Sequence, residues 1–320
     1  MKLLLKYLTL GLAAAASLAV MPLHAQQNND KPLRIVVPFA AGGAQDVIAR
    51  YLGAKLTDKL GGSVIIDNKA GAGGIVAADA VAKATDGATV LLATGGAITI
   101  APHLQAKLPY DPVHDLAPVA LVGDTPMTLA VRAESPYKTL ADVLRDAKAK
   151  PGQVTYASTG NGTVSHLTGA LLAQASGVNL LHVPYRGAAP ALTDLLGGQV
   201  ATIVTSVASI EPMVATGKAR VLGTFSRAAL PSMGTAPTVG EATGLPGMEV
   251  PVWAGMRAGA GIDKLSAALV EVCNLPETKQ RFAQLGAVNT CGNAAALGKV
   301  VTEDSQRWAK VIKQGGIKVD

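Results

Sequence analysis

The sequence predicts an α/β protein built from two domains, and three observations lead to this prediction. From Arg34 onward, short apolar runs alternate with longer stretches of 3.6-residue apolar periodicity, the order expected for sheets flanked by helices. The same alternation begins a second time at Met127. The chain has 320 residues, which is more than one compact core usually serves.

The first set of elements follows a β-α-β-α-β order. Strands are expected at residues 34–37, 64–66 and 90–93. The first connecting helix has one apolar face, and the second is an Ala-rich helix over about residues 74–83. The apolar face of the first helix consists of Val47, Ile48, Tyr51, Leu52, Leu56 and Leu60. This order predicts a mostly parallel sheet with helices on both faces.

A second set of strands and helices repeats the pattern. Thr139 opens a helix with Asp142 three residues later, a capping-box spacing. The other expected elements are strands at 127–131, 154–157, 180–183, 201–205, 219–224 and 252–256, helices at 164–175 and 190–196, and a long helical tail ending near 308–313. We expect residues 26–123 and 250–320 to form one domain and residues 124–249 to form the other. Two connections between the domains would form a hinge, which suits closure around a ligand.

The N-terminus has the pattern of a secretory signal peptide. Lys2 and Lys6 precede an apolar run over residues 8–20, and the small residue Ala25 precedes a polar stretch. We expect a signal peptide over residues 1–25, cleavage after Ala25, and a mature protein free in the periplasm. An uncleaved N-terminal anchor is the alternative, although the apolar run is short for a membrane span.

Composition and motif searches exclude several classes of function. Basic residues are dispersed rather than clustered, which argues against nucleic-acid binding. The net charge, +6 for the whole chain and +4 without Lys2 and Lys6, favours anionic ligands. No serine lies in a Gly-x-Ser-x-Gly motif, and no spacing indicates a metal site. The glycines of residues 71–74 do not complete a dinucleotide motif, because Val76 stands at its third position. We therefore expect a monomer without catalytic residues, metal or cofactor.

Two cysteines lie in one C-terminal stretch of the chain. Cys273 and Cys291 are the only cysteines in the sequence, and an even count in an oxidising compartment predicts a disulfide. Two buried free thiols are the alternative.

One predicted ligand-binding loop follows the first strand. Gly42 and Gly43 lie where a strand ends and a helix begins, so that backbone N–H groups and the positive end of the helix dipole can meet an anion. Asp46 in the first helical turn would hold the loop. The predicted contacts in this loop are Phe39, Ala41, Gly42, Gly43 and Asp46. A tight turn without a ligand is the alternative.

A second predicted loop has the same properties. Residues 158–163 follow a strand and precede a helix, and they combine hydroxyl, amide and glycine donors. The predicted contacts are Ser158, Thr159, Gly160, Asn161 and Thr163, with His166 supporting the loop. Two such loops at carboxyl ends of strands can face each other across a cleft. Because neither contains Arg or Lys, we expect carboxylate recognition by hydrogen bonds and helix dipoles rather than ion pairs.

In the two predicted loops and in several other motifs, the sequence resembles the Bug family, the extracytoplasmic solute receptors of tripartite tricarboxylate transport systems. The matching motifs are residues 37–43 with Asp46 and 49–50, 67–74, 108–112, 156–162, 182–187, 194–200, 237–239, Trp253 and 308–318. The resemblance implies a two-domain Venus-flytrap binding protein whose ligand is a di- or tricarboxylate, an acidic amino acid or an aromatic acid. It also implies that loops containing Thr94 and Ser206 contribute to the site.

The resemblance implies that the partners are membrane permease subunits of a tripartite transporter. A ligand-sensing receptor that presents its bound form to a membrane signalling protein is the alternative. Three departures from the family pattern affect the expected ligand: Ala40–Ala41 replaces a frequent pair of prolines, Ala88 replaces a common aromatic residue, and Ala201 replaces a usual Asp. We expect the change at Ala201 to lie near the segment that lines the cleft.

Overall fold

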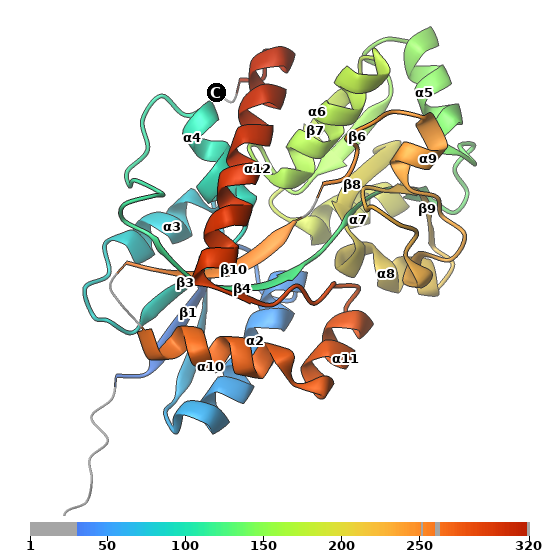
Figure 1. The fold of residues 1–320 in the computed structure, drawn as a ribbon. Helices are drawn as coiled ribbons and strands as arrows, with labels where there is room; N and C mark the ends of the chain where they lie inside the picture. The colour runs from blue at the N-terminus through green and yellow to red at the C-terminus, as the bar shows by residue number, and fades with distance from the viewer. Residues whose placement is uncertain (1–30, 251, 260–262, 319–320) are drawn as a thin grey trace, which may run out of the picture. The chain divides into compact units, whose positions relative to one another are not determined.

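The computed structural model describes residues 31–250, 252–259 and 263–318, and from Pro32 onward the chain forms one compact unit. Its strands form two separate sheets, flanked by helices (Figure 1), which confirms the predicted α/β class. The predicted signal peptide over residues 1–25 lies outside the described residues.

The first sheet has six strands in the order β11-β4-β10-β3-β1-β2. The strands are β1 (Leu33–Val37), β2 (Val64–Asn68), β3 (Thr89–Ala93), β4 (Ala117–Asp124), β10 (Trp253–Ala258) and β11 (Gly292–Asn293). Strand β1 pairs in parallel with β2 and β3, whereas β10 runs antiparallel to β3 and β4, and β11 antiparallel to β4. Strands β4 and β11 were not predicted from the sequence.

The second sheet has five strands in the order β7-β6-β8-β5-β9. They are β5 (Met127–Arg132), β6 (Thr155–Ser158), β7 (Leu181–Pro184), β8 (Thr202–Ser206) and β9 (Ala219–Thr224). Strand β6 pairs in parallel with β7 and β8, and β5 runs antiparallel to β8 and β9. The prediction of mostly parallel sheets was therefore wrong. Strands β5 and β10, next to the connections between the sheets, run antiparallel to both of their neighbours, a direction that local periodicity does not encode.

Helices cover both sheets. They are α2 (Ala44–Leu60), η2 (Ala72–Gly74), α3 (Ile75–Ala82), η3 (Gly96–Ile100), α4 (Ala101–Leu104), α5 (Leu140–Ala149), α6 (Val164–Ser176), α7 (Ala188–Leu196), α8 (Val207–Ala215), η4 (Pro231–Met233), α9 (Val239–Thr243), α10 (Asp263–Asn274), α11 (Pro276–Gln284) and α12 (Ala294–Gly315). The predicted capping box is confirmed: the Thr139 hydroxyl accepts from the Asp142 N–H, and the Asp142 carboxylate accepts from the Thr139 N–H.

Alternate residues of β1 show how the first sheet is buried on both faces. Ile35 and Val37 pack in a cluster with α2 and α10, whereas Val36 packs with α3 in a cluster on the other face. Figure 1 shows α2 and α10 on the same side of this sheet. Helix α12 belongs to both sheets, because Leu297 packs with the first and Trp308 with the core of the second.

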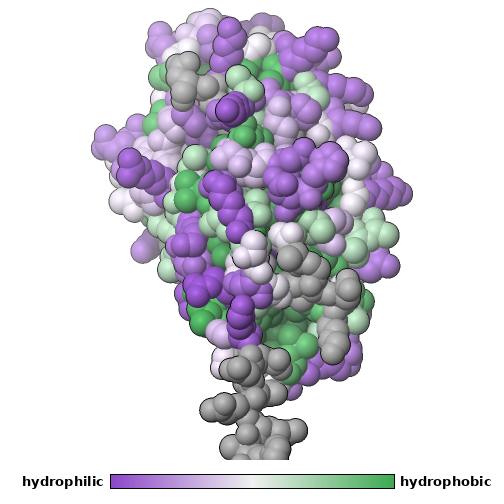
Figure 2. All heavy atoms as spheres, turned by 90° about the vertical axis from the view of Figure 1, so that its left-hand side faces the viewer, coloured by the Kyte–Doolittle hydropathy of each residue, from purple (hydrophilic) through white to green (hydrophobic). Residues whose placement is uncertain are grey.

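The strands of the first sheet come from both sides of residues 127–224 in the chain. The domain boundaries at 124 and 249 stay a prediction. No helix of the described residues is long and apolar enough to cross a membrane. On the face shown in Figure 2, hydrophilic side chains are spread among the hydrophobic ones.

The predicted disulfide between Cys273 and Cys291 was wrong, because both cysteines are free. Each thiol donates to the carbonyl oxygen of Val122, with sulfur–oxygen distances of 3.8 Å and 3.0 Å. A hydrogen bond with Cys291, together with burial, raises the pKa of Cys273 and keeps it protonated. The two thiols do lie close together, since both donate to the Val122 carbonyl oxygen, but an even cysteine count does not determine whether they are bonded.

Candidate functional site

A cavity of about 380 Å³ lies where loops of the two sheets meet. Strand ends of both sheets contribute to its walls, among them Thr94 after β3 and Ser206 at the end of β8. Eight of the thirteen predicted ligand contacts line it: Phe39, Ala41, Gly42, Gly43, Thr94, Thr159, Thr163 and Ser206. The two loops that the sequence singled out are thus brought together.

The first turns of four helices line this cavity. Residues 43–45 belong to the start of α2, 163–165 to α6, 187–190 to α7, and 206, 208 and 209 to α8. The N-cap residues of α2, α7 and α8 make no side-chain capping hydrogen bond. Because the first N–H groups of a helix have no acceptor within it, four positive helix ends converge on the cavity. Such an arrangement favours an anion.

The charge of the lining agrees with this conclusion. Among the described residues that line the cavity, Arg186 is the only charged one, and none is acidic. Arg186 lies in the loop between β7 and α7, which the sequence analysis did not assign to the site. The expectation of recognition by hydrogen bonds and helix dipoles rather than ion pairs considered only two loops, and it stays a prediction.

Three further hydroxyl groups in the lining were missed from the sequence, and one of them, that of Ser165, donates to the Val204 carbonyl oxygen at 2.5 Å. Thr205 is fully buried, and its Oγ1 has no hydrogen-bond partner among the described residues. Ser209 lies one turn into α8, and its Oγ is 2.9 Å from that of Ser206. Thr205 immediately precedes the predicted contact Ser206, so the strand end was the available signal.

A second cavity, of about 490 Å³, adjoins the first. Gly160 and Asn161 line this second cavity rather than the first. The residues common to both cavities are Phe39, Ala40, Gly73, Thr159, Thr163, Arg186 and Gly187. The two cavities therefore adjoin and share these residues as a common wall.

The glycine loop over residues 71–74 forms a wall of the second cavity. A Cβ atom on Gly96 would lie 2.5 Å from the carbonyl oxygen of Gly73, and one on Gly73 would lie 3.2 Å from that of Asn161. Backbone therefore packs directly on backbone where loops of the two sheets meet, which only glycine permits. From the sequence, this loop was an incomplete dinucleotide motif and part of the family motif over residues 67–74, with no predicted ligand contact.

Asp46 lines neither cavity but holds the first loop. Its buried carboxylate accepts from the Gly42 N–H at 2.9 Å and from Arg50 Nε at 3.0 Å. Burial raises the pKa of Asp46, but hydrogen bonds from Arg50, Gly42 and Asn68 outweigh it and lower the pKa overall. Because the Gly42 N–H is already bonded, the free donors of this loop lie further along, at the start of α2.

Ser158 and His166 also lie outside both cavities. The hydroxyl of buried Ser158 is 2.6 Å from Nε2 of His182, and the Gly162 N–H donates to Nδ1 of His166 at 3.3 Å. The two imidazole rings stack with centroids 3.9 Å apart. Burial lowers the pKa of His166 to about 4, and burial together with His166 lowers that of His182 to about 3. Both rings are neutral near pH 7 and support the loop over residues 158–163.

Of the three departures from the family pattern, only Ala40–Ala41 lies in the cavity lining. Ala201 stands immediately before β8, whereas the cavity lies at the other end of that strand, beyond Val204. Four residues of strand span about 13 Å. The expectation that Ala201 lies near the cleft was therefore wrong.

Within the described part of the chain, no group of His, Cys, Asp or Glu residues could hold a metal ion. The site consists of backbone N–H groups, hydroxyl groups and one guanidinium group around a space open to a small anion.

Comparisons with known proteins agree with this site. The model of the tripartite tricarboxylate transporter family receptor matches residues 48–317. A UPF0065 protein from the tcbD–tcbE intergenic region of Pseudomonas sp. strain P51 is 37% identical over 288 residues, covering 88% of this chain and 85% of the relative.

Two solved structures have the same fold. The periplasmic binding protein BugD superposes with a TM-score of 0.83 at 35% identity, covering 90% of this chain and 99% of that one. MatC from Rhodopseudomonas palustris, solved with bound malate, has a TM-score of 0.82 at 32% identity, covering 88% and 98%. The predicted two-domain Venus-flytrap fold is confirmed.

Proposed function

Because this chain belongs to the tripartite tricarboxylate transporter receptor family, we propose that it captures a small carboxylate in the periplasm for uptake by a tripartite transporter. The family and its solved members are solute-binding proteins and not enzymes. Permease subunits of such a transporter would receive the loaded protein. Residues 1–25 would direct export and be removed after Ala25.

One observation supports this function most strongly. Four helix N-termini converge on a cavity whose described lining contains one arginine and no acidic residue. Hydrogen bonds from N–H groups to a carboxylate are charge-assisted, and each contributes about 1.5–3 kcal/mol. A few such bonds suffice for micromolar binding. The malate bound to MatC belongs to the same chemical class.

The proposal assigns roles to the predicted site residues. The first turns of α2 and α8, with Thr94 and Thr205, would bind the carboxylate at the carboxyl ends of β1, β3 and β8. Thr159 and Thr163 would bind it from the loop before α6. Asp46, Ser158 and His166 would act indirectly, by holding the two loops.

The test is a thermal-shift screen of the purified protein beginning at residue 26. The panel contains malate, succinate, adipate, citrate, glutamate and benzoate, each with its amide. A ligand present at 100 times its Kd stabilises the fold by about 2.7 kcal/mol, which raises Tm by several degrees. We expect at least one acid to do so while its amide does not. If every acid and its amide behave alike, the site does not recognise carboxylate.

A further inference from the structure

Arg186 lies at the junction of the two cavities. It lines both of them, and no other described residue in either lining is charged. Its guanidinium group is exposed and makes no hydrogen bond or ion pair with any part of the chain that the structure describes. An unpaired cation in a lining free of carboxylates is available for a ligand.

The backbone on both sides of Arg186 is fixed. The Tyr185 N–H donates to the Ser158 carbonyl at 3.1 Å, and the Gly187 N–H donates to the Thr159 carbonyl at 3.2 Å. The Tyr185 hydroxyl also donates to Asp194 at 2.6 Å. The Arg186 side chain therefore extends from a rigid point that is bonded to the loop over residues 158–163.

We propose that Arg186 binds a second anionic group of the ligand, at the place where the two cavities adjoin. The proposal rests on the proposed function, since it assumes that a first carboxylate occupies the helix N-termini. The four helix N-termini would stabilise one anionic group through their N–H groups and dipoles, without a charged side chain. A second group would enter a space whose other walls are mainly glycine backbone, Phe39 and Tyr185, where Arg186 supplies the only positive charge among the described residues.

The geometry of a guanidinium group suits this role. Its planar fork of N–H groups matches a carboxylate with two parallel hydrogen bonds, which an ammonium group does not reproduce. Arg186 is thus the residue that would distinguish a dianion from a monoanion of the same shape. Because the group is exposed, its attraction for the ligand should weaken as salt is added.

The test compares succinate, malate and adipate with their monoamides, which keep the shape but lose one charge. Calorimetry is carried out on the wild type, Arg186→Gln, Arg186→Lys and the control Arg145→Gln, whose arginine is exposed, pairs with Asp142 and lies outside both cavities. For the dianion that the wild type binds best, we expect Arg186→Gln to weaken binding about tenfold or more and Arg186→Lys to recover part of the loss.

The monoamide should bind wild type and Arg186→Gln with affinities within about twofold of each other, and the salt dependence of dianion binding should decrease in Arg186→Gln. If Arg186→Gln binds the dianion as tightly as the wild type, or loses dianion and monoamide equally, the assignment of Arg186 is wrong while the proposed function stands. If the wild type binds neither these dianions nor any other acid of the thermal-shift panel, both proposals fail. If it binds only a monoacid such as benzoate, the assignment of Arg186 alone is wrong.

Discussion

At the scale of single residues, Gly43 shows how one hydrogen atom keeps the anion site open. Gly43 is the N-cap of α2, with an ordinary φ of −77°, and it lines the first cavity. A Cβ atom at this position would meet nothing closer than the Ala40 carbonyl oxygen at 3.6 Å. A larger side chain therefore fits the fold and must project where the ligand would lie.

We predict that Gly43→Val weakens carboxylate binding at least tenfold and lowers stability by only about 1 kcal/mol, the usual cost of a poor N-cap. Calorimetry measures the first quantity and urea unfolding the second. Gly62→Val is the control, because Gly62 has free space around it and lines neither cavity. Unchanged affinity in Gly43→Val would remove the start of α2 from the site.

At the scale of elements, strands β6 and β7 and helix α6 are joined by two neutral imidazoles. His166 is buried at the start of α6, and His182 lies on β7 beside Tyr156 of β6. The Gly162 N–H needs an unprotonated Nδ1 on His166 as its acceptor. In the unfolded chain, His166 has an ordinary pKa near 6.5 and takes up a proton below that pH. In the folded chain, it does not take up a proton until about pH 4.

This difference makes the fold acid-sensitive. The contribution of His166 to stability is complete above pH 6.5 and is lost as the pH falls toward 4, by about 2 kcal/mol at pH 5. We predict that His166→Asn, which keeps an acceptor for Gly162, loses less stability between pH 7 and 5 than the wild type. The exposed His103→Asn serves as the control. Equal losses in His166→Asn and wild type, measured by urea unfolding, would contradict the prediction.

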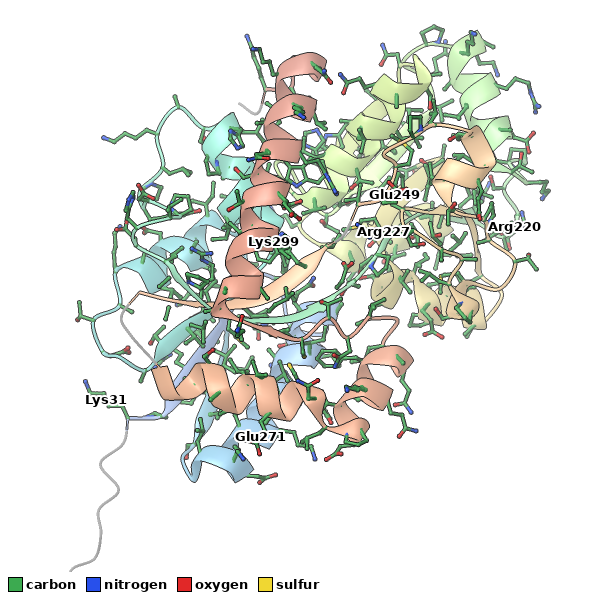
Figure 3. The ribbon with its side chains drawn as sticks, in the orientation of Figure 1. Lys31, Arg220, Arg227, Glu249, Glu271 and Lys299 are labelled. Carbon is green, nitrogen blue, oxygen red and sulfur yellow. The ribbon has the colours of Figure 1, made fainter. Side chains whose placement is uncertain are left out.

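At the scale of the whole molecule, the connections between the sheets separate two cavities. Met127 and Val252 line the first cavity, whereas the adjacent residues Pro126 and Trp253 line a third cavity of about 550 Å³. Arg227 after β9 and Glu249 before β10 also line this third cavity, and Figure 3 labels both.

The third cavity contains Asp124, the last residue of β4. Burial and the nearby Asp304 raise the pKa of Asp124 to about 6. The folded state therefore binds a proton more tightly than the unfolded state, and stability falls as the pH rises from about 4 to 6. We predict that Asp124→Asn is more stable than the wild type at pH 7.5, by up to about 3 kcal/mol, and nearly equal to it at pH 4.

Unfolding in urea at both pH values measures this difference, with the exposed Asp58→Asn as the control. A stability difference that is the same at both pH values would show that the Asp124 carboxyl titrates normally.

The sequence by itself determined most of the elements, though not β4 and β11, and it indicated the type of site. Strands, helices, the capping box at Thr139 and the two donor loops follow from neighbours within a few residues, because periodicity and capping act locally. Only the tertiary structure decided the antiparallel strands and the free thiols. It also decided that Ser158 and His166 lie outside the cavities and support the loop over residues 158–163.

The tertiary structure also brought Arg186, Thr205 and the loop over residues 71–74 to the cavities. These residues come from three different strand ends, and each short motif is also compatible with an ordinary turn. Their meeting depends on strand order and on how two sheets pack around α12, which are long-range contacts that no window of sequence contains.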